Sequence, residues 1–380
     1  MGKKALQLAS VASMIDQFNI PNIRLLQSLG YDVDVAADFT NPGNITKERA
    51  DELKERLHDM GVRVWDIPIP RSLNPAYVLR AYKDVKKIVS TEHYNLIHCH
   101  SPIGGVILRQ AAKPERKKGT KVIYTAHGFH FCDGAPVMNW LIYYPIEKYY
   151  SRYTDVLITI NKEDYRRAVK KLHAKKTVYV PGIGVDTDKY VARESARIRI
   201  RKEFDIKDSD IMLLSVGEFN KNKNHKAVIE AIKGIDNLTY VIVGKSEKEQ
   251  ELQLQASKCG VNLKLAGFRN DVADFYSAAD VYVLPSFREG LNVSLMEAMA
   301  SGLPVACGRI RGNTDLIKEK RVLFDPRDTE EIRASIINAM DNRDRFGQQN
   351  LERIKAFDLS VVLELISDIY RKEEINSGRN

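Results

Sequence analysis

Short apolar runs rich in β-branched residues alternate along the chain with longer stretches in which apolar residues recur at helical spacing. In the first half the strand-like runs are residues 5–9, 33–37, 62–67, 96–99, 122–126, 156–160 and 178–181. In the second half they are residues 212–216, 240–243, 263–266, 281–284, 304–307 and 322–324. Helical patterns lie between them, for example at residues 46–60, 76–90, 162–173, 224–233 and 247–258. Nearly continuous apolar strands separated by helices predict parallel sheets covered on both faces, the doubly wound α/β architecture.

So many strands exceed what one open sheet holds comfortably, and two Rossmann-like domains are therefore expected. The turn-rich and charged stretch 181–210 separates the two halves. We place an N-terminal domain at residues 1–190 and a C-terminal domain at residues 205–355. Residues 356–380 form a terminal helix, which either packs on its own domain or crosses back to the first one, because its helical periodicity is compatible with both.

Composition narrows the class of protein. With 380 residues, 44% hydrophobic and 29% charged, the chain is globular rather than disordered, fibrous or disulfide-stapled. Its four cysteines show no CxxC spacing, which favours a reducing compartment and argues against a ribbon-type zinc site. No signal peptide and no apolar run of bilayer length is apparent, so we expect a cytoplasmic protein, at most peripheral on the inner face of the cell membrane.

The charge is divided unevenly between the two halves. Residues 1–200 carry a net charge of +11, whereas residues 201–380 carry −2. A basic half attracts nucleic acid, anionic lipid headgroups or a phosphorylated substrate, and charge alone does not choose among them. One dense basic cluster is the candidate membrane patch Arg166, Arg167, Lys170 and Lys171, for which a solvated helix face is the alternative.

The richest candidate site follows the strand at 281–284. In doubly wound sheets, ligands bind beyond the carboxyl ends of the strands. Here the strand leads into Glu289-Gly290-Leu291, and Asn292 is a good N-cap for a helix that carries Glu297 on its second turn. Free helix amides bind a diphosphate, and a carboxylate accepts hydrogen bonds from vicinal sugar hydroxyls. The pattern therefore predicts a nucleotide-sugar site, with two ordinary surface carboxylates as the alternative.

This segment resembles the E-x7-E signature of the retaining GT-B glycosyltransferases of family 4, with Glu289 and Glu297 as its two glutamates. The resemblance continues through TAHGFHF, similar to the family's histidine loop, and PGIGVDTDKY, similar to its interdomain turn. LAGFRNDVADFYSAADVYVLPS resembles the approach to the signature. The opening of the chain, with HCHSP and DVLITINKEDY, is similar to the EpsD-like bacterial glycosyltransferases of capsule and exopolysaccharide biosynthesis. The resemblance implies a GT-B fold with an interdomain cleft, a donor held by the C-terminal domain, and no metal or other cofactor.

The resemblance also assigns roles to single residues. Lys223 corresponds to the phosphate-binding lysine of the family, Glu297 to the ligand of the ribose hydroxyls, and Glu289 to the residue at the donor sugar. Glu218 stands where the family usually has an Arg, which leaves one of the two usual diphosphate cations unassigned. Lys221 is a candidate replacement, with a solvated loop lysine as the alternative. The donor-binding residues expected in this way are Gly217, Lys223, Phe268, Glu289, Gly290, Leu291, Asn292 and Glu297.

Two histidines mark the acceptor side. His100 and His127 follow the strands at 96–99 and 122–126, so we expect both on one wall of the cleft. A neutral imidazole hydrogen-bonds a sugar hydroxyl or takes its proton, and the resemblance places His127 near the reacting carbon, where it and Glu289 are the candidate catalytic residues. Ser13 and Met14, at the exit of the first strand, are candidate acceptor contacts, with contact to the donor phosphate as the alternative.

A metal site competes with this interpretation of the histidines. The potential ligands gather in His98, Cys99, His100, His127, His130 and Cys132. His98 and Cys99, however, alternate along a strand and must point to opposite faces of the sheet. We therefore expect no metal and expect His98 and Cys99 to be buried.

The resemblance implies a retaining, metal-independent hexosyltransferase of exopolysaccharide or capsule biosynthesis. The expected donor is a UDP-sugar, with an N-acetylhexosamine such as GlcNAc foremost, and the expected acceptor is a polyprenyl-diphosphate-linked saccharide. A GT-B-type UDP-sugar epimerase is one alternative, and a non-enzymatic nucleic-acid-binding protein is another. The second lacks any recognisable binding module, and the strand exit at residues 9–16 lacks the GxGxxG of a dinucleotide enzyme.

Overall fold

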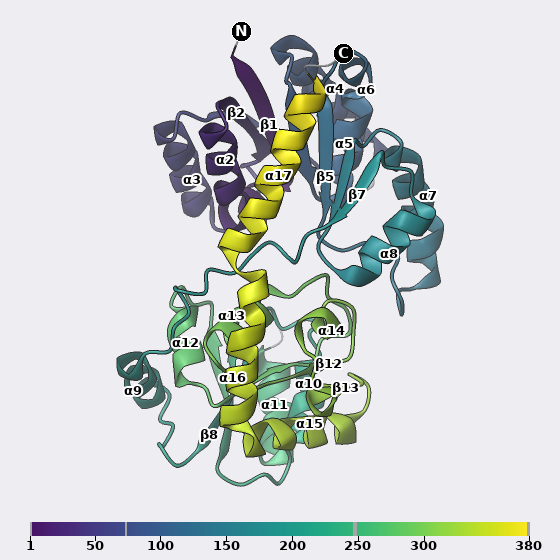
Figure 1. The fold of residues 1–380 in the computed structure, drawn as a ribbon. Helices are drawn as coiled ribbons and strands as arrows, with labels where there is room; N and C mark the ends of the chain where they lie inside the picture. Colours follow the sequence, from purple (N-terminus) through teal and green to yellow (C-terminus); the bar gives the residue numbers. More distant parts are fainter. Residues whose placement is uncertain (1, 73, 246–248, 378–380) are drawn as a thin grey trace. The chain divides into compact units, whose positions relative to one another are not determined.

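The computed structural model describes residues 2–72, 74–245 and 249–377. The chain divides into two compact units, the first of residues 1–183 with 362–380 and the second of residues 184–361. Each unit is built on one parallel sheet with helices on both faces (Figure 1). The predicted pair of doubly wound domains is confirmed.

The first unit holds a seven-stranded sheet in the order β3-β2-β1-β4-β5-β6-β7, with every pair parallel. The strands are β1 (Lys3–Val11), β2 (Tyr31–Asp38), β3 (Arg63–Asp66), β4 (Leu96–His100), β5 (Lys121–Ala126), β6 (Val156–Thr159) and β7 (Lys176–Tyr179). The helices are α1 (Ala12–Met14), a π-helical turn (Ile15–Asn19), α2 (Ile20–Ser28), α3 (Lys47–Asp59), α4 (Pro75–Glu92), α5 (Pro102–Ala111), α6 (Lys113–Arg116), α7 (Val137–Ser151) and α8 (Lys162–Lys171).

Two apolar cores cover the two faces of this sheet. On one face, α2 and α3 pack with the later part of the terminal helix α17 (Leu359–Ser377), which contributes Val362, Ile366, Ile369 and Tyr370. On the other face, α4, α5, α7 and α8 form the second core. The terminal helix thus begins in the second unit and completes the core of the first.

The second unit holds a six-stranded parallel sheet in the order β10-β9-β8-β11-β12-β13. The strands are β8 (Ile211–Val216), β9 (Leu238–Val243), β10 (Asn262–Gly267), β11 (Val281–Leu284), β12 (Val305–Gly308) and β13 (Leu323–Phe324). The helices are α9 (Glu194–Glu203), α10 (His225–Ala231), α11 (Glu249–Cys259), α12 (Val272–Ala278), α13 (Val293–Ala300), α14 (Asn313–Leu316), α15 (Thr329–Asp341) and α16 (Arg343–Ile354), with 3-10 turns at Lys320–Val322 and Lys355–Phe357. The start of the helix expected at 247–258 lies outside the described residues.

The strand order fixes where a ligand can enter. In each unit the order reverses beside the first strand, between β1 and β4 and between β8 and β11. At such a switch point the loops after the two strands diverge and leave a crevice at the carboxyl edge of the sheet. Both candidate sites should therefore lie at these two edges. Over the described part of the chain, no helix is both long and apolar enough to cross a membrane.

Candidate functional site

Two loops meet at the carboxyl edge of the second unit's sheet. One follows β8 and contains Asn222, and the other follows β11 and contains Phe287 and Arg288. Phe287 N donates to Asn222 O at 2.9 Å, and Asn222 Nδ2 donates to Arg288 O at 2.9 Å. These bonds join loops that are far apart in the sequence, at the switch point between neighbouring strands.

Lys223 and Glu289 form an ion pair across these loops. Lys223 Nζ lies 2.8 Å from Glu289 Oε1, and the two side chains are only 17% and 14% exposed. Gly217 leaves room for the Lys223 side chain, because a Cβ at position 217 would lie only 3.1 Å from Lys223 Cε. The φ of +146° at Gly217 also disfavours any residue with a side chain. The structure therefore brings together Gly217, Lys223 and Glu289.

The loop 289–292 leads directly into α13. Asn292 caps this helix, since its side chain accepts a hydrogen bond from Leu295 N at 2.9 Å. Gly312, at φ +80°, packs so closely against Gly290 that a Cβ would lie 2.2 Å from Gly290 O. The backbone of the segment 290–292 is thereby held at the N-terminus of the helix.

Arg311 adds a cation that the sequence analysis did not identify. Its Nε donates to the backbone oxygen of Glu289 at 2.8 Å, so its guanidinium lies beside the same loop. Glu218 and Lys221, in contrast, are exposed on the loop after β8. A signal was present in the sequence, because Arg311 follows a strand and precedes a glycine, as Glu289 and His127 do.

Glu297 is held by two tyrosines. Tyr190 donates to its Oε1, and Tyr276 donates to its Oε2 at 2.8 Å. Burial raises the pKa of Glu297 above the usual value, and the two tyrosine hydrogen bonds lower it by a smaller amount. The carboxyl group therefore has a fixed orientation, with one further lone pair on each oxygen. Phe268, after β10, is 63% exposed.

In the first unit, His100 and His127 are in direct contact. His100 Nδ1 lies 3.1 Å from His127 Nε2, while His100 Nε2 lies 3.2 Å from Gln7 Oε1. Gln7 Nε2 in turn donates to the Tyr370 hydroxyl at 3.2 Å. Gln7 and Tyr370 were missed by sequence reasoning, since the first lies inside an apolar strand and the second on a helix more than 360 residues away.

The histidine–cysteine cluster does not assemble as a ligand set. His98 Nδ1 lies 2.7 Å from the Tyr370 hydroxyl and His98 Nε2 lies 2.8 Å from Thr125 Oγ1, so both ring nitrogens are engaged. Cys99 belongs to the core on the opposite face of the sheet. Among residues 2–72, 74–245 and 249–377, no three His, Cys, Asp or Glu side chains are grouped to hold a metal ion.

Ser13 and Met14 lie in α1, directly after β1. Ser13 is buried, its amide donates to Pro42 O at 2.9 Å, and Gly43 packs against its hydroxyl. The Ser13 amide is therefore already paired, which argues against its binding the donor phosphate. Met14 is half-buried.

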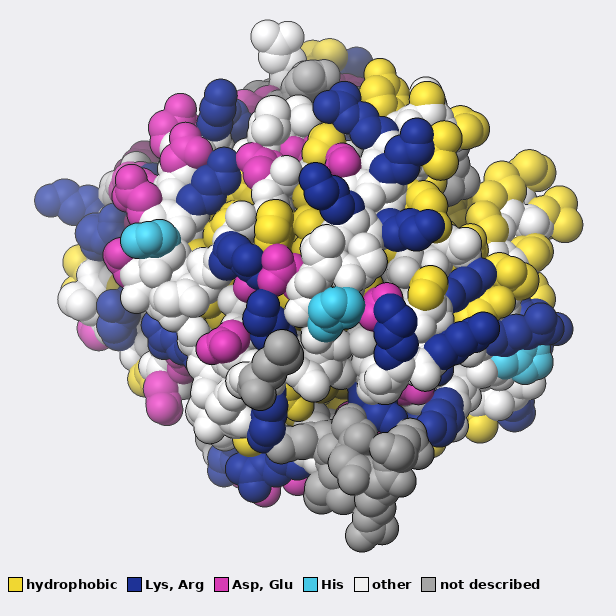
Figure 2. Space-filling view, turned by 90° about the horizontal axis from the view of Figure 1, so that it is seen from above, with side chains coloured by type: hydrophobic (Ala, Val, Ile, Leu, Met, Phe, Trp, Pro, Cys, Tyr) yellow, Lys and Arg dark blue, Asp and Glu magenta, His cyan; other side chains and the backbone are white. Residues whose placement is uncertain are grey.

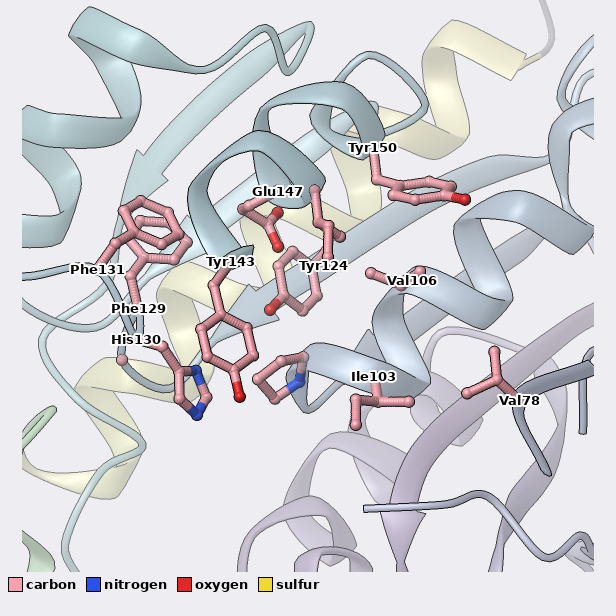
Figure 3. Close-up of a pocket in the computed structure, with 13 residues that line it drawn as sticks. Val78, Ile103, Val106, Tyr124, Phe129, His130, Phe131, Tyr143, Glu147 and Tyr150 are labelled. Carbon is pink, nitrogen blue, oxygen red and sulfur yellow. The ribbon is translucent and has the colours of Figure 1, made fainter. Parts of the chain in front are cut away.

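A separate apolar cavity of about 250 Å³ lies between α4, α5, α7 and the loop after β5. Figure 3 shows Ile103 and Val106 facing Tyr143, Tyr150 and the loop residue Phe129 across it. Glu147 lies in its wall and forms a buried ion pair with Arg109, with Oε1 2.6 Å from Arg109 Nη1. The pair fastens α7 to α5 beside the cavity.

Comparisons with known proteins agree with this architecture. The model of the family "Glycosyltransferase Family 4" matches residues 23–189, and that of "Glycosyl transferases group 1" matches residues 196–354. The putative glycosyltransferase EpsD of Bacillus subtilis (strain 168) is 35% identical over 97% of this chain and 97% of its own. The UDP-Gal:alpha-D-GlcNAc-diphosphoundecaprenol alpha-1,3-galactosyltransferase of Escherichia coli is 26% identical, over 97% and 96% of the two chains.

Among solved structures, Anabaena Alr3699/HepE in complex with UDP superposes with a TM-score of 0.78, at 18% identity, over 97% of this chain and 100% of its own. Sucrose-phosphate synthase from Thermosynechococcus elongatus also gives 0.78, at 18% identity over 97% and 99%. At such identities the likeness shows the GT-B fold alone. None of these relatives is an epimerase, so that alternative has no support. The chain belongs to the family 4 glycosyltransferases of the GT-B fold and is EpsD-like.

Proposed function

We propose that this glycosyltransferase moves a hexose, foremost an N-acetylhexosamine such as GlcNAc, from a UDP-sugar to a polyprenyl-diphosphate-linked saccharide in exopolysaccharide or capsule biosynthesis. The transfer retains the anomeric configuration and needs no metal. The name of the Escherichia coli relative, which pairs a UDP-sugar with a diphosphoundecaprenol-linked sugar, supports these two substrate classes. The UDP complex of HepE supports uracil as the nucleobase of the donor.

The Lys223–Glu289 ion pair beside the N-terminus of α13 carries this proposal. When the donor binds, one of its diphosphate oxygens takes the place of the Glu289 carboxylate as the partner of Lys223. Glu289 is then able to accept hydrogen bonds from the donor sugar. The amides of Gly290, Leu291 and Asn292 receive the other phosphate oxygens. Negative charge grows on the departing diphosphate, so these fixed positive groups stabilise the transition state more than the ground state.

Arg311 supplies the second diphosphate cation in our proposal. The family's Arg is replaced here by Glu218, and Lys221 is exposed. Arg311 instead reaches the Glu289 loop from the segment after β12. Charge neutralisation without a metal then rests on one lysine, one arginine and a helix N-terminus.

Glu297 and Phe268 complete the donor site. The tyrosine bonds orient the Glu297 carboxylate, so that its remaining lone pairs accept the two ribose hydroxyls. The exposed ring of Phe268, after β10, offers an apolar face to the nucleoside.

On the acceptor side, His127 faces the reacting hydroxyl, with His100 behind it. Burial lowers the pKa of His127 to about 4, so its ring is neutral near pH 7 and accepts a proton or hydrogen bond. Ser13 and Met14 are proposed to line the same side.

A lipid-linked acceptor requires contact with a membrane, and the first unit offers a surface of suitable chemistry. Its α7 exposes large apolar side chains, which we name the α7 outer face: Val137 (73% exposed), Met138 (59%), Leu141 (64%), Ile142 (39%) and Tyr149 (45%). Figure 2 shows hydrophobic side chains gathered at an edge of the molecule beside Lys and Arg. We propose that this face inserts among the lipids of an anionic membrane.

The predicted basic patch lies on the neighbouring helix α8. Lys171 Nζ lies 5.7 Å from the centre of the Trp140 ring of α7. Arg166, Lys170 and Lys171 are exposed, but the Arg167 side chain is only 9% exposed and pairs with Glu163 and Asp133. Three of the four predicted cations therefore remain available for lipid headgroups, because Arg167 is used to join α8 to the loop before α7.

A donor and acceptor assay tests the proposed function. Isothermal titration with UDP-, ADP- and GDP-sugars identifies the donor, and polyprenyl-diphosphate-linked GlcNAc is then offered with EDTA present. We expect the UDP-sugars to bind and the product linkage to keep the donor's anomeric configuration by NMR. Inverted product, or activity that EDTA abolishes and a divalent metal restores, contradicts the proposed mechanism.

A further inference from the structure

An unbroken chain of hydrogen bonds runs through the first unit and ends at His127. Along it, His98 joins Thr125 to Tyr370, and Gln7 joins Tyr370 to His100. Each donor–acceptor distance lies between 2.7 and 3.2 Å. Five of the six side chains are buried, and only His127, which ends the chain, is partly exposed. The sheet supplies four members, the loop directly after β5 supplies His127, and the terminal helix α17 supplies Tyr370. Figure 1 shows α17 crossing the first unit's sheet.

The partners determine the direction of each hydrogen bond. The oxygen of an amide cannot donate, so His100 Nε2 donates its proton to Gln7 Oε1. A neutral imidazole carries one proton, so His100 Nδ1 accepts, and the proton between the two histidines belongs to His127 Nε2. Burial lowers the pKa of both rings, to about 4 for His127, which agrees with neutral imidazoles.

The same reasoning orders the other end of the chain. Gln7 Nε2 donates to the Tyr370 hydroxyl, which therefore gives its own proton to His98 Nδ1. His98 Nε2 then donates to Thr125 Oγ1. If the Gln7 amide were turned over, the Tyr370 phenol, all three histidines and the Thr125 hydroxyl would have to reverse their hydrogen bonds together. Tyr370 thus couples the orientation of Gln7 to the rest of a fully bonded core network.

We propose that Gln7 and Tyr370 are positioning residues that hold the His127 ring protonated at Nε2, which leaves Nδ1 to accept the hydrogen bond of the acceptor hydroxyl. This inference rests on the proposed role of His127 at the acceptor. The terminal helix α17 then does more than pack on the sheet, because the Nε2-protonated form of His127 depends on the Tyr370 hydroxyl, which α17 provides.

The protonated nitrogen of His127 is observable without any substrate. Nitrogen-15 NMR of the full-length protein with labelled histidine distinguishes the two neutral imidazole forms, and His127→Gln assigns the signals. We expect the Nε2-protonated form in the parent and a mixture of both forms in Tyr370→Phe, because the Gln7 amide loses its partner. Tyr94→Phe is the matched control: it removes another buried hydroxyl of the same unit, one bonded to Asp34, and should leave His127 unchanged.

The outcomes separate this inference from the proposed function. An Nδ1-protonated His127 in the parent, or a Tyr370→Phe spectrum equal to that of the parent, overturns the inference. Gln7→Met serves as the second variant if Tyr370→Phe does not fold. In transfer assays we expect Tyr370→Phe to lower kcat about tenfold, with an unchanged KM for the donor. This is less than the roughly 10²–10⁴-fold that general acid–base catalysis contributes, because part of the His127 population keeps the Nε2-protonated form. If His127→Ala keeps the parent kcat, the proposed role of His127 fails whatever the NMR shows.

Discussion

Lys223 Nζ and Glu289 Oε1 lie 2.8 Å apart, although 66 positions separate the two residues in the chain. Two loops from neighbouring strands make this contact, and an N-capped helix and Arg311 lie beside it. The pair lies at the switch point of the second unit's sheet, which is where ligands bind in doubly wound sheets.

Replacing Lys223 by Ala should weaken the binding of UDP, because the diphosphate loses a charged partner. Hydrogen bonds to charged groups contribute about 1.5–3 kcal/mol, which corresponds to a roughly tenfold to 150-fold rise in Kd. Lys221→Ala, on the same loop but exposed, is the control and should bind as the parent does. Isothermal titration with UDP measures both, and an equal loss in the two variants would indicate only the general charge of the loop.

Arg311→Ala should also weaken UDP binding, by a smaller amount than Lys223→Ala, since its guanidinium already bonds the Glu289 backbone. Arg309→Ala is the matched control, because Arg309 is exposed and pairs with Glu331. The salt dependence of binding gives a second measurement: losing a diphosphate cation should make Kd less sensitive to salt. Parent-like UDP binding by Arg311→Ala would leave the missing family arginine without a replacement.

The affinity for UDP should depend on pH through Glu297. Burial raises the pKa of this carboxyl, so its proton returns as pH falls from neutrality sooner than for an ordinary glutamate. A protonated carboxyl group is a poorer acceptor of hydrogen bonds from the ribose hydroxyls. The Kd for UDP should therefore rise as the solution becomes mildly acidic. Titrations with UDP over a range of pH test this. In Glu297→Gln the acidic rise should disappear, and its persistence would assign the titration to another group.

The sequence predicted the architecture better than it predicted the contacts. Strand alternation and the glutamate spacing were local patterns, and they located the loop of Glu289 and the cap at Asn292. Two sets of contacts were invisible because they depend on side chains from distant elements: the tyrosines on Glu297 and the Tyr370–Gln7–His100 bonds. Counting charge along α8 likewise did not reveal that Arg167 turns inward to Glu163 and Asp133.

The Arg109–Glu147 pair predicts a large effect on stability. Arg109 is fully buried and also stacks on Tyr124, with 4.2 Å from the guanidinium carbon to the ring centre. Glu147→Gln leaves a buried guanidinium without its counter-charge and should lower the free energy of unfolding by about 3–5 kcal/mol. Arg109→Met with Glu147→Met should cost less than the single change, since no charge remains unpaired. Urea unfolding followed by circular dichroism compares them, and a double variant no more stable than Glu147→Gln would contradict this explanation.

Membrane binding should require both the α7 outer face and the cations of α8. Leu141→Gln with Met138→Gln removes apolar contact with lipid, whereas Arg166→Gln with Lys170→Gln and Lys171→Gln removes attraction to anionic headgroups, at roughly 1 kcal/mol for each cation. Both variants should sediment less with phosphatidylglycerol vesicles than the parent does. Added salt should weaken only the contribution of the cations to vesicle binding, because salt screens charge. Leu254→Gln changes a leucine of similar exposure in the second unit (58% against 64% for Leu141) and is the control. UDP binding should stay unchanged throughout, since the proposed donor site belongs to the second unit. If both variants sediment as the parent does, this surface is not the membrane contact, and a change in oligomeric state in Leu141→Gln would indicate that a second copy of the chain covers it.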